Sequence, residues 1–498
     1  MLLLSIVAAI IAYVLAKFYL ETRKYPKGPF PLPFIGNGLQ FGYYIFKKGS
    51  MDAAYKAFKQ QFGPVFTVYF GPYPLTVICD YDLAVDAYIT KGGYLTDRWL
   101  QPMAEKITGG KGIVCTNGEY WAEQRHLAQT TLKNLEALKG DNIERRIIDE
   151  FHYRCDKITS DDVIQIEDNE LFDIFAANII NFFLFSSRLS ESDQKAFFDV
   201  KKQLDERLRN ISMLDIFMPR IALKIPYFKK RHDNQMNPYA EIKEFMRKQV
   251  MERIDAVKSG THKIAEVPEN FVDAFLVEMG KQEDSNVDGN FDLATLVQDI
   301  VDLFLQGQRM ISATLSWGIV YLLNYPEIAS RVQNEIRSVT GGDRDLLLSD
   351  KAKTTYFNAT INEIQRLGSI IPVNLFRAAT EDVTVGGVLF RKGQAVAAHL
   401  PMIMHDEKHF TDPNTFNPDR YLSDESLADR MFPFSLGNRR CLGESIARAT
   451  HYLILGNLIQ KYEKFEAAAD QIPSMEPENK NFAIRRPANF KIRLITRN

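Results

Sequence analysis

The run FSLGNRRCLG, which ends at Gly443, surrounds one of only four cysteines among the 498 residues of the chain. A cysteine thiolate is an anionic, electron-rich ligand that suits haem iron. Gly437 and Gly443 would let the backbone and the following helix approach a porphyrin. Arg439 would offer its guanidinium to a haem propionate, and Phe434 would cover the sulfur. Cys441 could instead be an ordinary buried thiol, but this composition matches all five positions by chance only about once in ten thousand. The run therefore predicts a haem-thiolate site with Cys441 as the metal ligand.

This loop resembles the cysteine loop of the cytochrome P450 family, and three stretches that precede it stand in the order typical of that family. Trp121 and Arg125 lie four positions apart, so both face one side of a helix. The EIQR run from Glu363 to Arg366 resembles the family's Glu-x-x-Arg. The FNPDRY run around Arg420 resembles the segment that brings a second arginine to it. The resemblance covers nearly the whole chain.

The resemblance implies a mostly helical fold with a small β-rich lobe, of the α+β class. Length alone would predict about three domains, whereas the resemblance implies a single catalytic domain over 38–498. It implies haem b as cofactor and gives roles to two groups of residues. Propionate partners would be Trp121, Arg125, Arg377 and Arg439, and a buried structural triad behind the haem would be Glu363, Arg366 and Arg420.

Composition excludes several other classes of protein. Apolar residues make up 46% of the chain, charged residues 25%, and the formal net charge is -2. These values describe an ordinary globular body with a large core. Without a basic run or a basic isoelectric point, the chain lacks the electrostatic signature of a nucleic-acid binder. The cysteines show neither metal-type spacing nor a dense disulfide framework, which fits a reducing compartment.

The first twenty residues are predominantly apolar and predict a membrane anchor, since a helix of this length matches a hydrocarbon core of ~30 Å. A cleavable signal peptide is the alternative, but no basic residue precedes the apolar run and no small-x-small cleavage site stands out. Arg23, Lys24 and Lys27 follow at once. Because positive flanks stay cytoplasmic, we expect a single-pass endoplasmic reticulum protein with a cytosolic body. Residues 21–37 predict a basic, proline-rich linker between the anchor and the body.

Hydrophobic patterns and turn residues predict a few further elements. They are a hairpin of 66–70 with 75–79, a second hairpin of 383–390 with 394–398, a polar loop over 280–290 and a long helix over 293–323.

The centre of that long helix departs from the family pattern. The family usually has a small residue, Gly, any residue, an acid and Thr, whereas this chain reads QGQRM at 306–310, in a register set by LSW at 315–317. Gly307 is kept, but Arg309 replaces the acid and Met310 replaces the alcohol. In the family the acid and the alcohol organise water and supply protons. Methionine has no O–H donor, and arginine stays protonated.

Two residues could compensate for this loss. Thr314 follows Met310 by four positions on the same helical face, about 5.4 Å along the axis, and Gln306 lies one turn in the other direction. Alternatively, Met310 packs against the haem and pocket water supplies the protons unaided. We therefore take Gln306, Gly307 and Thr314 as candidate catalytic residues.

Several other assignments rest on the resemblance. His405 resembles a structural position, and His126, a lone histidine beside Arg125, is more often structural than a metal ligand. Candidate residues lining a mostly apolar substrate pocket are Val114, Gln306, Gln308, Met310, Ile371, Val373 and Phe482.

The resemblance implies a monooxygenase that inserts one oxygen atom of O2 into a lipophilic small molecule, such as a fatty acid, a steroid or a xenobiotic. Electrons would come from NADPH through a flavoprotein reductase, with Lys133 and Arg440 as candidate docking charges. Two alternatives remain open because of Arg309 and Met310. One is a haem-thiolate isomerase or dehydratase acting on a peroxide substrate, and the other is a non-catalytic haem or ligand-binding protein.

Overall fold

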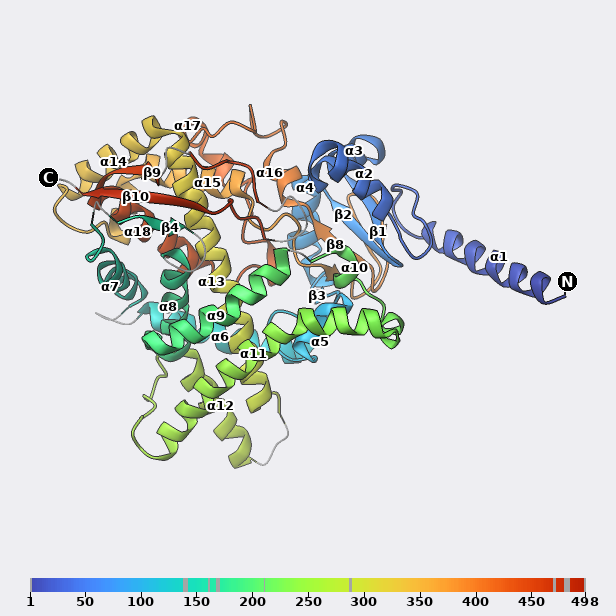
Figure 1. Ribbon diagram of the computed structural model, residues 1–498, viewed down its shortest axis with the longest axis horizontal. Coiled ribbons are helices and arrows are strands. Elements are labelled where there is room, and N and C mark those ends of the chain that lie inside the picture. The colour runs from blue at the N-terminus through green and yellow to red at the C-terminus, as the bar shows by residue number, and fades with distance from the viewer. Residues whose placement is uncertain are drawn as a thin grey trace.

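The computed structural model describes residues 2–137, 142–159, 162–166, 171–209, 211–285, 289–468, 472–478 and 484–496. Most of them lie in helices arranged around α13 (Leu293–Asn324), which runs through the middle of the molecule in Figure 1. The expected long helix is confirmed. It begins where the Asp292 carboxylate accepts a hydrogen bond from the Thr295 backbone N–H, the usual way to satisfy a free donor at a helix start.

The remaining elements follow in chain order. In the first half the helices are α1 (Leu2–Thr22), α2 (Gly38–Lys48), α3 (Met51–Phe62), α4 (Tyr81–Val85), α5 (Pro102–Thr108), α6 (Gly118–Ala137), α7 (Ile143–Cys155), α8 (Phe172–Phe185), α9 (Glu191–Arg209), α10 (Met213–Ile216) and α11 (Pro226–Lys258). Later helices are α12 (Phe271–Ser285), α14 (Pro326–Thr340), α15 (Thr355–Gly368), α16 (Leu400–Met404), α17 (Asp419–Ser423) and α18 (Glu444–Lys461). Short helical turns are η1 (Asp86–Thr90), η2 (Gly92–Tyr94), η3 (Arg220–Lys224), η4 (Leu348–Lys353), η5 (Glu425–Ala428) and η6 (Gly437–Arg439).

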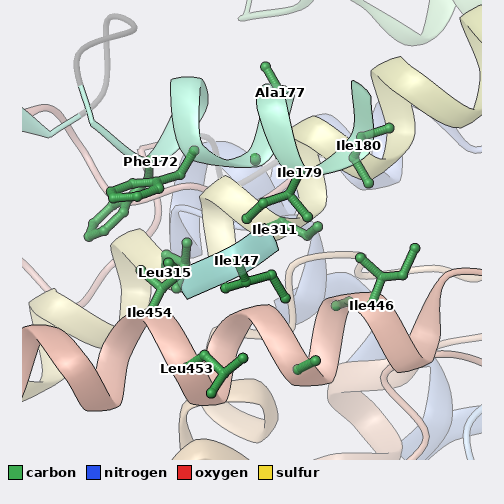
Figure 2. Close-up of a cluster of buried hydrophobic side chains, with 14 of the residues drawn as sticks. Ile147, Phe172, Ala177, Ile179, Ile180, Ile311, Leu315, Ile446, Leu453 and Ile454 are labelled. Atoms are coloured by element: carbon green, nitrogen blue, oxygen red, sulfur yellow. The ribbon is translucent and has the colours of Figure 1, made fainter. Parts of the chain in front are cut away.

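The main core lies where α8 and α18 pack around α13. Almost every residue of α8 is buried, so this helix has no polar face. Figure 2 shows Ile311 of α13 between α8 and α18. Ile179 of α8 and Ile454 of α18 belong to the same buried cluster. Each such buried side chain stabilises the fold by about 1.5–3 kcal/mol. The packing fixes α13 and α8 relative to each other.

The β-rich part consists of three small sheets. Their strands are β1 (Val65–Phe70), β2 (Tyr73–Ile78), β3 (Asp97–Arg98), β4 (Ile164–Ile166), β5 (Arg377–Ala378), β6 (Val383–Val385), β7 (Val388–Phe390), β8 (Ala395–Ala398), β9 (Tyr462–Ala467) and β10 (Phe490–Thr496). The largest sheet has the order β1-β2-β8-β5-β3, and the others are β4-β10-β9 and β6-β7. A mostly helical molecule with a small β lobe confirms the expected α+β class.

The first predicted hairpin is confirmed, and the second is wrong. β1 and β2 pair antiparallel, with Val65 opposite Ile78. In the second region β6 pairs with β7 across Gly386 and Gly387, which both have positive φ, so the turn falls inside the segment predicted as one strand. β8 instead joins β2 in parallel. Residues 280–285, expected in a polar loop, belong instead to α12.

The helix α1 extends away from the body at the amino-terminal end (Figure 1). Several of its apolar side chains face solvent, with Ile10 57% and Tyr13 67% exposed. Within the described ranges, no helix combines the length and the apolar character needed to cross a membrane.

Candidate functional site

Cys441 lies in a tight loop, residues 434–443, directly before α18, and we call this segment the ligand loop. The Cys441 backbone N–H donates to the Phe434 carbonyl at 2.9 Å and closes the loop. Gly437 has a φ of +69°, and a Cβ built there would lie 1.8 Å from the Tyr88 carbonyl oxygen. The close contact with Tyr88 and the positive φ therefore require glycine at position 437. At Gly443, by contrast, a Cβ would contact no described protein atom within 4 Å.

The Cys441 thiol is exposed on one side and surrounded by protein on the other. Burial raises its pKa, and the Glu444 carboxylate raises it further. A hydrogen bond from the Gly443 backbone and the charges of Arg125 and Arg440 lower it but do not outweigh burial. The protein alone thus favours the neutral thiol. Coordination to a metal cation would deprotonate it.

Four arginines gather beside this loop from separate parts of the chain: Arg98, Arg125, Arg377 and Arg439. Burial, followed by repulsion from Arg377, lowers the pKa of Arg98 to about 10. Burial and repulsion from Arg98 lower the pKa of Arg439 to about 9. No carboxylate in the described part of the chain forms an ion pair with any of the four. The cluster is therefore short of negative charge.

The guanidinium groups of Arg377 and Arg439 donate hydrogen bonds to backbone carbonyls, but some of their N–H groups have no partner among the described residues. Arg439 donates to the carbonyls of Thr96 at 2.6 Å and Thr116 at 2.7 Å, and Arg377 donates to that of Leu436 at 2.6 Å. Buried Arg439 Nη1 and Arg377 Nε have no hydrogen-bond partner among the described residues. Unused donors on clustered cations fit the two carboxylates of a haem, since guanidinium–carboxylate bonds are strong and directional.

Trp121 supports this cluster through its ring. The Arg439 guanidinium lies 3.6 Å from the Trp121 ring centroid, and that of Arg125 lies 5.6 Å from it. Arg125 also donates to the Arg440 carbonyl at 2.8 Å, which ties α6 to the ligand loop. Trp121 therefore orients two of the arginines by stacking.

Arg98 is a site residue that sequence reasoning missed. It lies on the two-residue strand β3, which pairs with β5 so that Arg98 lies opposite Arg377. Its Nε donates to the Val114 carbonyl at 3.1 Å. Nothing in the local sequence marks this arginine, because its position depends on the pairing of strands almost 280 residues apart.

Glu363, Arg366 and Arg420 meet in the fully buried centre of the molecule. The Glu363 carboxylate accepts two bonds from Arg366, each 2.8 Å, and one from Arg420 at 3.1 Å. Tyr421 Oη and the Asn417 backbone N–H complete its shell at 3.2 and 3.0 Å. A buried charge group with all its bonds satisfied holds α15, α17 and the loop between them in one arrangement.

The centre of α13 differs in two respects from the sequence-based assignment. A Cβ at Gly307 would lie 2.7 Å from the Ile180 side chain, so this residue allows close packing against α8. Gln308, expected in the substrate pocket, is fully buried and donates to the Asp173 carboxylate at 2.7 Å. Both residues thus face α8, because α8 packs directly over this turn of α13.

Arg309 also has a partner on a neighbouring helix. Its Nη2 lies 3.2 Å from Asp205 Oδ1 on α9. Thr314 Oγ1 donates to the Met310 carbonyl at 3.0 Å, so its only proton is already committed. Gln306 is exposed. Of the two residues proposed to compensate for Met310, only Gln306 presents a free polar group.

Met310 and Thr314 line a small cavity of about 30 Å³ that reaches Phe434 of the ligand loop. The other residues lining it are Trp317, Ile364, Gln365, Ile370, Pro433, Ala447 and His451. This volume holds about one water molecule. Met310 and Phe434 of the ligand loop therefore line the same cavity.

The remaining candidate pocket residues lie apart from this cavity. Val114 packs against the main core, and its N–H donates to Asp302 at 3.1 Å. Ile371 packs against the cluster around β6 and β8, and Val373 bridges to His399 beside β8. Phe482 lies outside the described residues.

The structure also places the two histidines and the two candidate docking cations discussed from the sequence. His405 Nε2 lies 3.2 Å from the Arg366 carbonyl, and burial lowers the His405 pKa to about 4, in keeping with the structural role expected. His126 and Lys133 are exposed on α6. Arg440 is exposed and pairs with Glu444.

Comparison with known proteins gives a consistent result. The family model described as Cytochrome P450 matches residues 26–493. The chain is 33% identical to the probable cytochrome P450 cyp-35D1 of Caenorhabditis elegans, over 93% of each protein. It is 32% identical to human cytochrome P450 2C8 over 88% of each. A solved zebrafish cytochrome P450, described with progesterone, superposes with a TM-score of 0.76 at 21% identity, covering 89% of this chain and 98% of that one.

Proposed function

The chain belongs to the cytochrome P450 family and is a haem-dependent monooxygenase, and we propose that it oxygenates lipophilic small molecules at a haem held by Cys441. The observation that carries the proposal is an exposed thiol beside four arginines that have no carboxylate partner in the described residues. One soft anionic ligand and an excess of positive charge match an iron porphyrin with two propionates.

In this proposal each part of the site has one task. Trp121 and the four arginines bind and orient the propionates. Phe434, Gly437 and Gly443 shape the loop around the sulfur. The triad of Glu363, Arg366 and Arg420 stiffens the protein behind the haem, as its satisfied hydrogen bonds suggest.

Haem in this site supplies dioxygen activation, to which the thiolate contributes electron density. The protein must supply protons to the pocket. Because the Thr314 proton is committed and Met310 has no O–H, we assign proton delivery to water ordered by the Gln306 amide.

We further propose that the electrons come from NADPH through a flavoprotein reductase. The ligand loop reaches the surface at Arg440, and Lys133 is exposed on α6, whose Arg125 contacts that loop. Both are suitable docking charges for an acidic partner. The apolar surroundings of Met310, Ile370 and Phe434 favour a lipophilic substrate such as a fatty acid, a steroid or a xenobiotic.

For the location, we propose the endoplasmic reticulum membrane, with α1 as the attachment and the catalytic domain, residues 38–498, in the cytosol. Exposed apolar side chains on α1 and the basic residues that follow it in the 21–37 linker support this orientation.

A second candidate function is supported by the centre of α13. Arg309 is engaged with Asp205, and Met310 offers no proton, so the acid–alcohol pair of the family has no equivalent here. An isomerase or dehydratase whose substrate already carries a peroxide needs no such pair.

Two measurements test these proposals. The reduced carbon monoxide complex should show the red-shifted Soret band of thiolate ligation, and Cys441→Ala should abolish it. A band that persists in Cys441→Ala would refute the assignment. Next, product formation with NADPH and a reductase identifies the monooxygenase, whereas conversion of a hydroperoxide without NADPH identifies the isomerase. A protein that binds lipophiles but does neither is a binding protein.

A further inference from the structure

Two carboxyl groups on α13, those of Asp299 and Asp302, are buried and have no task in the site described above. Asp299 is fully buried, and neither of its carboxylate oxygens has a hydrogen-bond partner within the described ranges. Asp302 is 9% exposed. Burying a carboxylate without partners costs free energy, and such a group usually responds by binding a proton. Both side chains are therefore suited to carry protons inside the protein.

Asp302 lies beneath the loop that precedes α6. Its Oδ2 accepts a hydrogen bond from the Val114 backbone N–H at 3.1 Å, and its Oδ1 accepts one from the Gln298 amide at 3.0 Å. A Cβ at Gly112 would lie 2.4 Å from Asp302 Oδ2, so the loop backbone closes directly over the carboxyl. Cys115 of the same loop is neutral, because burial raises its pKa to about 12. Each Asp302 oxygen can thus take a proton without losing its bond.

The charges around the two acids favour bound protons. Burial raises the pKa of Asp302 to about 6, although its hydrogen bonds and the Lys243 ammonium of α11 lower it. Burial, followed by repulsion from Asp302 and Asp292, raises the pKa of Asp299 well above its usual range, against the lowering effect of Lys111. Asp302 therefore gains and loses its proton not far below neutral pH, where a general acid is most effective.

Both acids lie on the face of α13 that leads to the pocket. Four side chains share this face at intervals of three or four residues: Asp299, Asp302, Gln306 and Met310. This spacing stacks them about one turn, ~5.4 Å, apart, a distance that a single water can bridge between polar side chains. Gln306 is exposed, and Met310 lines the cavity that reaches Phe434. The row of acids therefore ends at the pocket.

The other end of the row reaches solvent through hydroxyl groups. Thr295 lies one turn before Asp299, and its Oγ1 accepts hydrogen bonds from Tyr120 Oη at 3.1 Å and Lys111 Nζ at 3.2 Å. Burial raises the pKa of Tyr120, so its phenol stays protonated. Lys111 also pairs with Asp292, whose side chain is 51% exposed. This end offers a route by which protons lost from the buried acids are replaced from solvent.

We propose that Asp302 supplies protons to the haem pocket through water ordered by Gln306, and that Asp299 restores the proton of Asp302. The proposal rests on the proposed monooxygenase function, which takes up protons together with electrons. In each transfer the Asp302 O–H bond breaks, its proton passes to the Gln306-bound water, and that water passes a proton into the pocket. The Asp302 carboxylate then takes a proton from Asp299, which takes one from solvent at the Thr295 end. Because it acts through Gln306 and water, Asp302 is a positioning residue rather than a catalytic one.

The first experiment detects the bound proton without turnover. Infrared spectra of the haem-loaded full chain should contain the carbonyl band of a protonated carboxylic acid that disappears as the pH rises through about 6. Asp302→Asn should lack this titrating band, whereas the exposed control Asp149→Asn should keep it. Asparagine has the size of aspartate and can still accept the Val114 bond, so the loop should stay in place. A missing wild-type band, or one that persists in Asp302→Asn, would refute the proposal.

The second experiment measures proton supply during turnover with NADPH and a reductase. Product formed per NADPH in wild type should fall as the pH rises above about 6, because Asp302 loses its proton there. At that pH Asp302→Asn should form at least about tenfold less product per NADPH and lose this pH dependence, since a general acid contributes ~10²-fold or more. Product formed with hydrogen peroxide in place of NADPH should fall much less, because peroxide brings its own protons. Equal losses in both assays would show a purely structural role and overturn the proposal.

A double variant tests whether Asp302 acts through Gln306. Asp302→Asn combined with Gln306→Leu should lose no more product per NADPH than Asp302→Asn alone, because residues on one path are not additive. Asp299→Asn should cause a smaller loss, because Asp302 keeps its own proton and only regains it more slowly. Additive losses in the double variant would place Gln306 on a separate path and refute the scheme.

Failure of this proposal differs visibly from failure of the proposed function. If wild type lacks the Soret band of thiolate ligation, the haem assignment is wrong, and the infrared band still decides whether Asp302 holds a proton. If both bands are present but Asp302→Asn keeps the wild-type yield per NADPH, Asp302 holds a proton without supplying it, and this proposal alone fails.

Discussion

Met310 occupies the position on α13 where a hydroxyl would most directly serve the pocket. It lines the cavity beside Phe434, and its own carbonyl takes the only proton of Thr314. Met310 thus has no O–H group to supply a proton, and the hydroxyl of Thr314 is already bonded to the backbone.

Met310→Thr should therefore increase the fraction of NADPH-derived electrons that ends in product. An added hydroxyl at the pocket wall acts as a proton donor, so product formed per NADPH should rise, up to the ~10²-fold scale of general acid catalysis, and released peroxide should fall. Product, peroxide and NADPH are measured together. Arg309 should be left unchanged, because Arg309→Glu would place a carboxylate against Asp205. Tight coupling in wild type with no gain in Met310→Thr would show that Gln306-bound water already suffices.

A second residue-scale effect concerns the buried acid Asp302 on α13. Its carboxylate accepts bonds from the Val114 N–H and the Gln298 amide, yet burial raises its pKa to about 6. Because the folded state holds this proton more tightly than the unfolded chain, the free energy of unfolding falls as pH rises from about 4 to 6.

Asp302→Asn should remove this part of the pH dependence. The shift of about two pKa units corresponds to roughly 3 kcal/mol. Urea unfolding of the detergent-solubilised protein between pH 4 and 7 should show a flatter stability profile for Asp302→Asn than for wild type. The matched change Asp149→Asn removes a carboxylate that is 60% exposed and should leave the slope as it is. An unchanged slope in Asp302→Asn would mean that Asp302 titrates normally.

Among the elements, the ligand loop shows how two glycines of one motif serve different purposes. Gly437 has a positive φ and no room for a Cβ beside the Tyr88 carbonyl. Gly443 has a φ of −87°, which any residue adopts, and open space around its Cβ position.

Gly437→Ala should lower the melting temperature and abolish haem retention, because the loop must move away from Tyr88; backbone strain alone costs about 1–3 kcal/mol. Gly443→Ala should keep the melting temperature of the haem-free protein. Thermal unfolding and the haem content of purified protein are the measurements. If Gly443→Ala keeps its fold but loses haem, the role of Gly443 is toward the porphyrin. Equal melting temperatures for Gly437→Ala and wild type would contradict the packing argument.

At this scale the sequence predicts regular elements well and pairings between distant strands poorly. The helix around 293–323 and the hairpin of β1 and β2 follow from local periodicity and turns. The parallel pairing of β8 with β2 and the position of Arg98 on β3 depend on long-range contacts that no local pattern encodes. The sequence likewise does not predict the ion pair of Arg309 with Asp205, because this pair depends on which face of α9 packs against α13.

On the scale of the whole molecule, α1 extends away from the body (Figure 1). Deleting residues 2–22 should release most of the protein from alkaline-washed membranes while the carbon monoxide band stays intact, because the residues proposed to bind haem all lie beyond residue 97. Fractionation followed by haem spectra is the measurement. Full retention on membranes would point to further membrane contacts in the body. Secretion of a shortened, disulfide-bonded product would restore the signal-peptide alternative.

The cluster of Arg98, Arg125, Arg377 and Arg439 also bears on how the cell assembles this molecule. Repulsion from neighbouring arginines adds to burial in lowering the pKa of Arg98, Arg377 and Arg439, so the positive charges of the cluster repel one another until negative charges neutralise them. We expect haem binding to stabilise the fold through iron ligation and through charge neutralisation at once. We expect chains without haem to be less stable and more often degraded, so that haem supply influences how much of the protein accumulates.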